Sequence, residues 1–205
     1  MIRAVVFDVG ETLVDETRQW ASLAEALNVP AFTLMATVGG LIARGETLRK
    51  AVTLVAPDVD FAALPRSYRI EAADLYPDAL PCLVRLKQRG LIVGIAGNQP
   101  RGAEQALQAC GIDADFVATS AGWGVAKPDP GFFDRIIDAA GQPASAIAYI
   151  GDRLDNDVGP ARAAGMRAIR LRRGPWAMLE ATPLPPDVPS IDSLDALVAI
   201  LDEFR

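Results

Sequence analysis

The sequence predicts an α/β protein in which helices cover both faces of a parallel β-sheet. Short apolar runs alternate with helical segments of about ten residues through the second half of the chain. The length of 205 residues suits one main domain with a small insert. Hydrophobic residues make up 51% and charged residues 22%, which is the composition of a globular protein.

The first predicted strand is the apolar run 2–7, which ends at Asp8. Further strands are expected at 91–96, 115–118, 146–150 and 166–171, with helices at about 101–110, 130–140 and 156–164 between them. Pro77 opens a helix that stops at Arg89-Gly90. Residues 173–190 are rich in proline and lack periodicity, which predicts a surface arm, and 192–204 are expected to close the chain as an amphipathic helix.

Residues 16–75 differ from the rest of the chain. Alanine and leucine recur there at helical spacing, and glycine and proline separate about four segments, at 17–27, 31–43, 46–55 and 61–75. The sequence therefore predicts two units: an α/β core made of 1–15 and 76–205, and a helical unit of 16–75 inserted after the first strand.

The composition excludes several kinds of chemistry. The chain has no histidine, which removes Ser-His-Asp and Cys-His catalysis and any His-ligated zinc or copper site. Its net charge of −6, without a basic run, argues against nucleic acid or an anionic membrane as partner. No apolar stretch has the length of a membrane span, and Cys82 and Cys110 are expected to be buried thiols. We therefore expect a cytoplasmic protein.

Charged and polar residues follow the ends of four predicted strands. Because the carboxyl ends of parallel strands meet at one edge of a sheet, we expect these residues to converge there. In chain order they are Asp8, Gly97 with Asn98, Lys127, and Asp152 with Asp157.

Three carboxylates that lie close together cannot all stay ionised without a counter-charge. A hard divalent cation such as Mg²⁺ resolves this repulsion, and it favours carboxylates together with waters and phosphate oxygens. Lys127 adds a second positive centre. Such a set suits phosphoryl transfer, which depends on positioning and charge neutralisation, and an aspartate can itself be the nucleophile.

Three motifs carry a family resemblance. Phe7-Asp8-x-x-x-Thr12-Leu13, Lys127-Pro128-Asp129 and Gly151-Asp152-x4-Asp157 resemble those of the haloacid dehalogenase-like hydrolase superfamily, in their order and in their strand-end positions. The resemblance implies a Rossmann-like core with an inserted helical cap, Mg²⁺ as cofactor and a covalent aspartyl intermediate. It also implies a phosphatase whose partner is a small phosphorylated metabolite.

Roles follow from the resemblance position by position. Asp8 would be the nucleophile, and Lys127 would steady both Asp8 and the phosphate. The implied metal ligands are Asp8, the backbone carbonyl of Gly10, Asp152 and Asp157, with Asp157 supporting either the metal waters or Lys127. The implied phosphate-binding residues are Gly97, Asn98 and Lys127.

The sequence departs from the family pattern at two positions. Phosphatases of the family usually have a second Asp where this chain has Gly10, and that Asp serves as general acid and base. They usually have Ser or Thr where this chain has Gly97. Acid–base help contributes about 10²–10⁴ in rate, so the departures predict an impaired or specialised phosphatase. Glu11 could act through a water, but its position one residue along leaves its direction open.

Two alternatives remain open at this stage. The loss of both side chains, at Gly10 and Gly97, also suits a ligand-binding protein of the same fold whose catalysis has decayed. A 2-haloacid dehalogenase is less favoured, because dehalogenases of the family usually have an aromatic residue in place of Gly10. Trp20, Trp123 and Trp176 are expected to be packing residues, although Trp20 and Trp123 could line the pocket.

Overall fold

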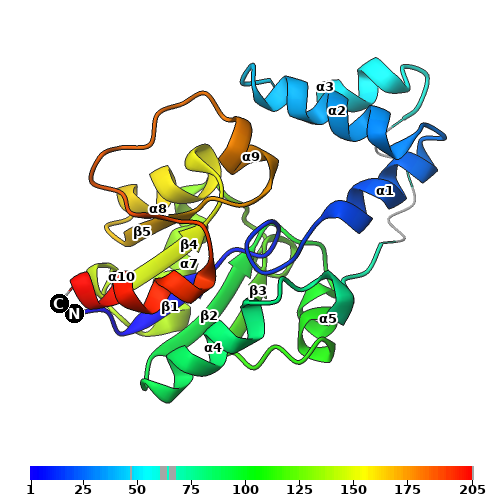
Figure 1. Cartoon of the computed structure of the whole chain (residues 1–205). Helices are drawn as coiled ribbons and strands as arrows, with labels where there is room; N and C mark the ends of the chain where they lie inside the picture. Colours follow the sequence, from blue (N-terminus) through cyan, green and yellow to red (C-terminus); the bar gives the residue numbers. More distant parts are fainter. Residues whose placement is uncertain (47, 61–63, 65–67, 205) are drawn as a thin grey trace.

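A computed structural model describes residues 1–46, 48–60, 64 and 68–204. The described residues form a sheet of six parallel strands in the order β3-β2-β1-β4-β5-β6 (Figure 1). The strands are β1 (Ala4–Phe7), β2 (Ile92–Gly97), β3 (Phe116–Thr119), β4 (Ile147–Gly151), β5 (Arg167–Leu171) and β6 (Ser190–Ile191). This is the doubly wound, Rossmann-like order, and it confirms the predicted α/β class.

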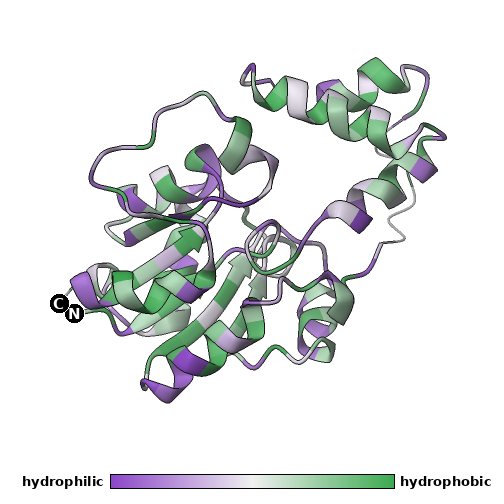
Figure 2. Cartoon of the chain, in the orientation of Figure 1, coloured by the Kyte–Doolittle hydropathy of each residue, from purple (hydrophilic) through white to green (hydrophobic). Residues whose placement is uncertain are grey.

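The central strand β1 is buried on both faces of the sheet. Val5 and Phe7 point into one hydrophobic core, whereas Ala4 and Val6 point into the other, as the two-residue period of a strand requires. Helices α4 (Ala79–Gln88), α5 (Ala103–Ala109) and α10 (Leu197–Glu203) cover the first face; α7 (Pro130–Ala140) and α8 (Gly159–Ala163) cover the second. Figure 2 shows the central strands coloured mainly as hydrophobic.

Three helices form a unit beside the sheet, which we call the helical insert (Figure 1). They are α1 (Thr17–Ala26), α2 (Ala31–Ile42) and α3 (Leu48–Val55). The insert has a hydrophobic cluster of its own, centred on Leu34 and Leu41, which are both fully buried. Its link to the core includes Trp20 of α1, whose ring lies 6.3 Å from that of Trp176 in α9 (Gly174–Leu179). The boundaries 16 and 75 stay a prediction.

Among the described residues, no single helix combines the length and apolar composition of a membrane span. Helices α1 and α2 meet those criteria only when they are taken as a pair, and the chain bends by 113° between them.

The five predicted strands are present, but several other predictions need correction. Of the helix expected at 61–75, residues 61–63 and 65–67 lie outside the described part; residues 68–71 are not helical and only a 3-10 turn, Ala72–Asp74, follows. A capping box between Glu71 and Asp74 marks the start of this turn, because the backbone at Glu71 is extended and cannot continue a helix from the residues before it.

The expected arm at 173–190 contains helix α9 and ends at strand β6. Pro175 stands in the first turn of α9, where its missing N–H costs no hydrogen bond. The helix expected at 156–164 consists of a π-turn (Leu154–Val158) and then α8. Further short turns are α6 (Ser120–Trp123), η3 (Ala144–Ala146) and η5 (Leu194–Ala196).

Candidate active site

The acids and the lysine at the strand ends lie together at one edge of the sheet. Asp8 follows β1 and Asp152 follows its neighbour β4, at the point where the strand order changes direction. Asp157 reaches the same place from the π-turn after β4. One carboxylate oxygen of each of these three residues lies within 4.8 Å of the others, and all three residues are buried.

Lys127 is ion-paired to two of these acids. Its Nζ lies 2.7 Å from Oδ1 of Asp8 and 2.5 Å from Oδ1 of Asp157, and its side chain is fully buried. Burial by itself would lower the pKa of Lys127, but the charges of Asp157 and Asp8 more than offset it and hold that pKa well above its usual value. The ammonium group therefore stays charged and fixes the position of Asp8.

Asp152 and Asp157 differ in how their oxygens are used. Both oxygens of Asp157 accept hydrogen bonds, Oδ1 from Lys127 and Oδ2 from the backbone N–H of Arg153 at 3.0 Å. Burial raises the pKa of Asp157 to about 6. In contrast, Oδ2 of Asp152 is buried without a hydrogen-bond partner in the described part of the chain. Burial, followed by the charges of Asp157 and Asp8, raises the pKa of Asp152 well above its usual value.

These features fit a bound cation. A buried carboxylate oxygen without a partner is costly, and a cluster of three carboxylates with one ammonium carries excess negative charge. Oxygen ligands of this kind are those that hard divalent cations prefer.

Asn98 holds the lysine loop in place. Its Nδ2 donates to the carbonyl of Lys127 at 2.9 Å, and its Oδ1 accepts from the N–H of Lys127 at 2.9 Å. Both ends of the Asn98 amide are thus engaged with the Lys127 backbone. At Gly97, a Cβ would lie 2.7 Å from Oδ1 of Asp8, so a side chain there would press on the Asp8 carboxylate. The phosphate contacts expected at Gly97 and Asn98 stay predictions.

The space beside Gly10 is filled by Glu16. A Cβ at Gly10 would lie 2.1 Å from Oε1 of Glu16 and 2.7 Å from its Cδ. Burial, and then the charges of Glu11 and Asp8, raises the pKa of Glu16 to about 8. Glu16 could not be predicted from the sequence, because no motif marks it and only the fold of the loop carries its carboxyl back to Gly10.

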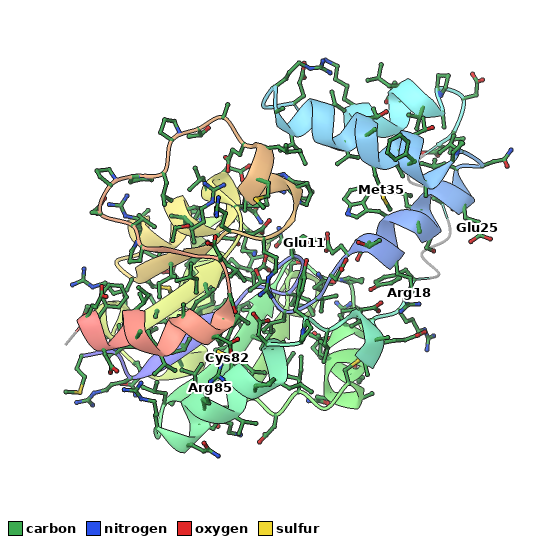
Figure 3. All side chains as sticks on the ribbon, viewed as in Figure 1. Glu11, Arg18, Glu25, Met35, Cys82 and Arg85 are labelled. Atoms are coloured by element: carbon green, nitrogen blue, oxygen red, sulfur yellow. The ribbon has the colours of Figure 1, made fainter. Side chains whose placement is uncertain are left out.

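Glu11 has a different place from the one that the sequence left open. Its backbone adopts a φ of +51°, and its Oε2 accepts a hydrogen bond of 2.6 Å from the hydroxyl of Tyr76. Its Oε1 accepts from the backbone N–H of Glu16 at 3.1 Å. Glu11, labelled at the junction of core and insert in Figure 3, therefore fixes the loop that presents Glu16.

Arg153, Trp176 and Trp20 form a row of contacting side chains, which we call the aromatic wall, and Arg153 and Trp20 both act on Glu16. The guanidinium of Arg153 lies 4.8 Å from the centre of the Trp176 ring and pairs with Asp155 at 2.7 Å, and the other side of this wall is Trp20 from the insert. Trp20 and Trp176 are packing residues, as expected, and they join the insert to the core. Trp123 packs instead against Phe132, with ring centres 5.1 Å apart.

The centre itself is closely packed. The surface of the core has an open depression of about 370 Å³ beside Asp78 and Arg173 and another of about 490 Å³ beside Pro128 and Ala163, and neither is lined by Asp8, Lys127, Asp152 or Asp157. The side chain of Asp8 is only 10% exposed. Most of the Asp8 side chain is therefore covered by its neighbours.

Comparison with known proteins shows which family this chain resembles. A model of the haloacid dehalogenase-like hydrolases matches residues 2–165. A glyceraldehyde 3-phosphate phosphatase of Methanopyrus kandleri is 29% identical to the chain, over 100% of this chain and 98% of the relative. The phosphatase MT3486 of Mycobacterium tuberculosis is 31% identical, over 84% and 88% of the two chains.

Solved structures agree on the fold. A 2-haloacid dehalogenase from Pseudomonas syringae pv. Tomato DC3000 superimposes with a TM-score of 0.60 at 22% identity, and each chain is covered completely. That similarity concerns the architecture alone.

Residues 2–165, which match the family model, include the three strand-end motifs and the whole acid–lysine centre. The chain belongs to the haloacid dehalogenase-like hydrolase family.

Proposed function

We propose that this hydrolase is a Mg²⁺-dependent phosphatase of small phosphomonoesters that works through an aspartyl-phosphate on Asp8. The observation that carries this proposal is the buried ammonium of Lys127, held between Asp8 and Asp157 beside the unpartnered oxygen of Asp152. One positive group and a cation position next to a carboxylate nucleophile are what phosphoryl transfer needs. The names of the two curated relatives support the same chemistry.

The cation site follows from the donors that the centre offers. Oδ2 of Asp152 and Oδ1 of Asp8, the oxygen that Lys127 also contacts, are the natural first ligands, and the family resemblance adds the backbone carbonyl of Gly10. Asp157 contributes mainly through Lys127, because both of its oxygens already accept hydrogen bonds. When bound, Mg²⁺ would neutralise the charge of the phosphate oxygens and hold them near Asp8.

Asp8, Lys127 and the backbone at Gly97 and Asn98 have separate roles in the reaction. With Oδ1 bound to Lys127, Oδ2 of Asp8 attacks phosphorus, the bond from phosphorus to the ester oxygen breaks, and an acyl phosphate forms on Asp8. The third N–H of the Lys127 ammonium and the backbone at Gly97 and Asn98 bind phosphate oxygens. Water then attacks phosphorus, which releases inorganic phosphate and restores the Asp8 carboxylate.

We propose that the helical insert acts as a cap, within the predicted range 16–75. It meets the core through Trp20 and Trp176 close to Arg153, beside the acid–lysine centre. Since Asp8 is nearly buried, we expect the insert to move away to admit substrate and to return over it. Side chains of the insert would select the organic part of the phosphomonoester, and glyceraldehyde 3-phosphate is the first compound to test.

The test is a panel of sugar, triose and aryl phosphates, assayed with Mg²⁺ and with EDTA. Asp8→Asn removes the nucleophile and should lower kcat by about 10³ or more on every substrate that the wild type cleaves. Asp138→Asn, the same change at an exposed site on α7, is the matched control and should retain activity.

Three outcomes would contradict the proposal. Phosphatase activity that is unchanged in Asp8→Asn would remove the nucleophile assignment. Release of chloride from a 2-haloacid in the presence of EDTA would identify a dehalogenase instead. Binding of Mg²⁺ and phosphate without turnover of any compound in the panel would identify the decayed, ligand-binding protein.

A further inference from the structure

We propose that the carboxyl of Glu16 is the proton donor and acceptor of the active site. This inference rests on the proposed phosphatase function. The chemistry needs such a group, because an ester oxygen leaves poorly as an alkoxide and water attacks poorly as a neutral molecule. A positioned acid–base group is worth about 10²–10⁴ in rate.

The Glu16 carboxyl occupies the place of the side chain that position 10 lacks. Its Oε1 lies 2.1 Å from the point where a Cβ of Gly10 would stand, two residues along the loop from Asp8. Glu16 stands at the start of α1, so the loop from Gly10 to Glu16 turns back and delivers a carboxyl into the space that the missing side chain leaves. The absence of a Cβ at position 10 is what makes room for this arrangement.

The other acids at the centre and in the loop, Asp157, Glu11 and Asp152, are already engaged. Asp157 accepts hydrogen bonds from Lys127 and from the Arg153 backbone. Glu11 accepts from Tyr76 and from the Glu16 backbone. Asp152 belongs to the proposed cation site, and the chain has no histidine.

Neighbouring side chains hold the Glu16 carboxyl, and none of the described residues forms a close ion pair with it. Trp20 of the insert contacts it, and Arg153 acts on it through its charge. Both side chains also meet Trp176, which fixes them at the junction of insert and core. The carboxyl thus lies against Gly10, within reach of the charges of Asp8 and Arg153, and stays available for proton transfer.

Each step exchanges one bond at phosphorus and moves one proton to or from Glu16. In the first, Oδ2 of Asp8 bonds to phosphorus, the ester oxygen leaves with its electron pair, and the proton of the Glu16 carboxyl moves to that oxygen to give the alcohol. In the second, a water oxygen bonds to phosphorus, a water proton returns to the Glu16 carboxylate, and the bond from phosphorus to Asp8 breaks. The products are an alcohol and inorganic phosphate, and Glu16 ends protonated as it began.

Glu16→Gln tests the inference, because glutamine keeps the shape and cannot exchange the proton. With an alkyl phosphate, kcat should fall about 10²–10⁴-fold. With an aryl phosphate whose leaving group needs no proton, the first step should survive, so a burst of aryl alcohol should precede a slow steady state. Glu25→Gln, the same change on the exposed outer side of α1 (Figure 3), is the matched control.

A rescue experiment separates chemistry from folding. Glu16→Ala removes the carboxyl and opens the space beside Gly10, and it should show the same loss on alkyl phosphates. Gly10→Asp combined with Glu16→Ala returns a carboxyl to that space and should recover activity to within about tenfold of the wild type. Thermal unfolding of each variant identifies any that fails to fold, and the glutamine variant remains informative if the alanine variants do not fold.

The outcomes distinguish this inference from the proposed function. If Asp8→Asn is inactive while Glu16→Gln matches Glu25→Gln on alkyl phosphates, Glu16 carries no proton and the inference is wrong. Equal losses on alkyl and aryl phosphates without a burst would make Glu16 a structural residue. If Asp8→Asn retains full activity, or the wild type cleaves no phosphomonoester, the proposed function fails first and the inference fails with it.

Discussion

The acid–lysine centre and the Gly10–Glu16 loop both gather buried carboxyl groups, but they stabilise them differently. In the centre, one ammonium pairs with Asp8 and Asp157 at 2.5–2.7 Å, and backbone contacts fix the remaining oxygen of Asp157. In the loop, Glu11 is held by a neutral hydroxyl and a backbone N–H, and among the described residues the charge of Arg153 acts on Glu16 without a close ion pair. A charge network is rigid and expensive to break, whereas a carboxyl at the end of a flexible side chain can be moved.

The largest effect is expected from Lys127→Met, which breaks the charge network. The substitution leaves Asp8 and Asp157 buried without their counter-charge, and removal of one partner from such a pair costs about 3–5 kcal/mol. Denaturant unfolding measures this cost, and kcat should fall with it. The double variant Lys127→Met with Asp157→Asn should recover part of the lost stability. A loss of stability below about 1 kcal/mol would mean that the network is not what holds the centre.

Substitution of alanine at Gly151 in the centre and at Gly10 in the loop compares the two regions directly. Gly151→Ala is expected to lower the stability of the protein more. Its Cβ would lie 2.5 Å from Cγ of Asp157, a side chain that is bonded at both oxygens and cannot move away. Overpacking of this kind costs about 1–3 kcal/mol. A stability equal to that of the wild type, measured by thermal unfolding, would show that the Asp157 side chain is free to shift.

Gly10→Ala should cost less stability, about 1 kcal/mol or below, because the atoms in its way are the end of the Glu16 side chain. Its effect should appear in catalysis instead, since the displaced carboxyl no longer occupies the loop. Turnover of an alkyl phosphate should fall more than turnover of an aryl phosphate. If Gly10→Ala destabilises the protein more than Gly151→Ala does, the contrast between the two regions is reversed.

The smallest effect concerns Asp74, whose backbone carbonyl accepts a hydrogen bond of 2.8 Å from the N–H of Asp15 and so anchors the Gly10–Glu16 loop. Hydrogen bonds from Arg18, at 2.6 and 2.8 Å, lower the pKa of Asp74 below its usual 3.8. A carboxyl with a lowered folded-state pKa stabilises the protein above its unfolded value, and that stabilisation is lost as the pH falls through the folded value. At neutral pH, the free energy of unfolding of Asp74→Asn should therefore be about 1 kcal/mol lower than that of the wild type. This difference in unfolding free energy should disappear in acid, as the pH falls below 3.8 through the folded-state pKa of Asp74. A gap that is independent of pH would rule out the charge of Asp74 as its cause.

Sequence patterns predicted the parts of this molecule that topology alone brings together. Asp8, Lys127 and Asp152 follow strands, and a parallel sheet carries strand ends to one edge whatever the loops do. The place of Glu16 could not be predicted in this way. It depends on a left-handed Glu11 and on the bond from Tyr76, a residue distant in the sequence. Helix α9 was not predicted, because a proline is typical both of a loop and of the first turn of a helix. Only the fold shows that Pro175 stands in a first turn.

The most direct test of the central claim is to trap the covalent intermediate. The enzyme is mixed with Mg²⁺ and an aryl phosphate, quenched in acid during the first turnover and digested, and the peptides are measured by mass spectrometry. We expect one phosphoryl group on the peptide that contains Asp8, and a larger yield of it in Glu16→Gln, because the step that releases phosphate is slowed. An enzyme that turns over while its Asp8 peptide stays unmodified would contradict the assignment of Asp8 as the nucleophile.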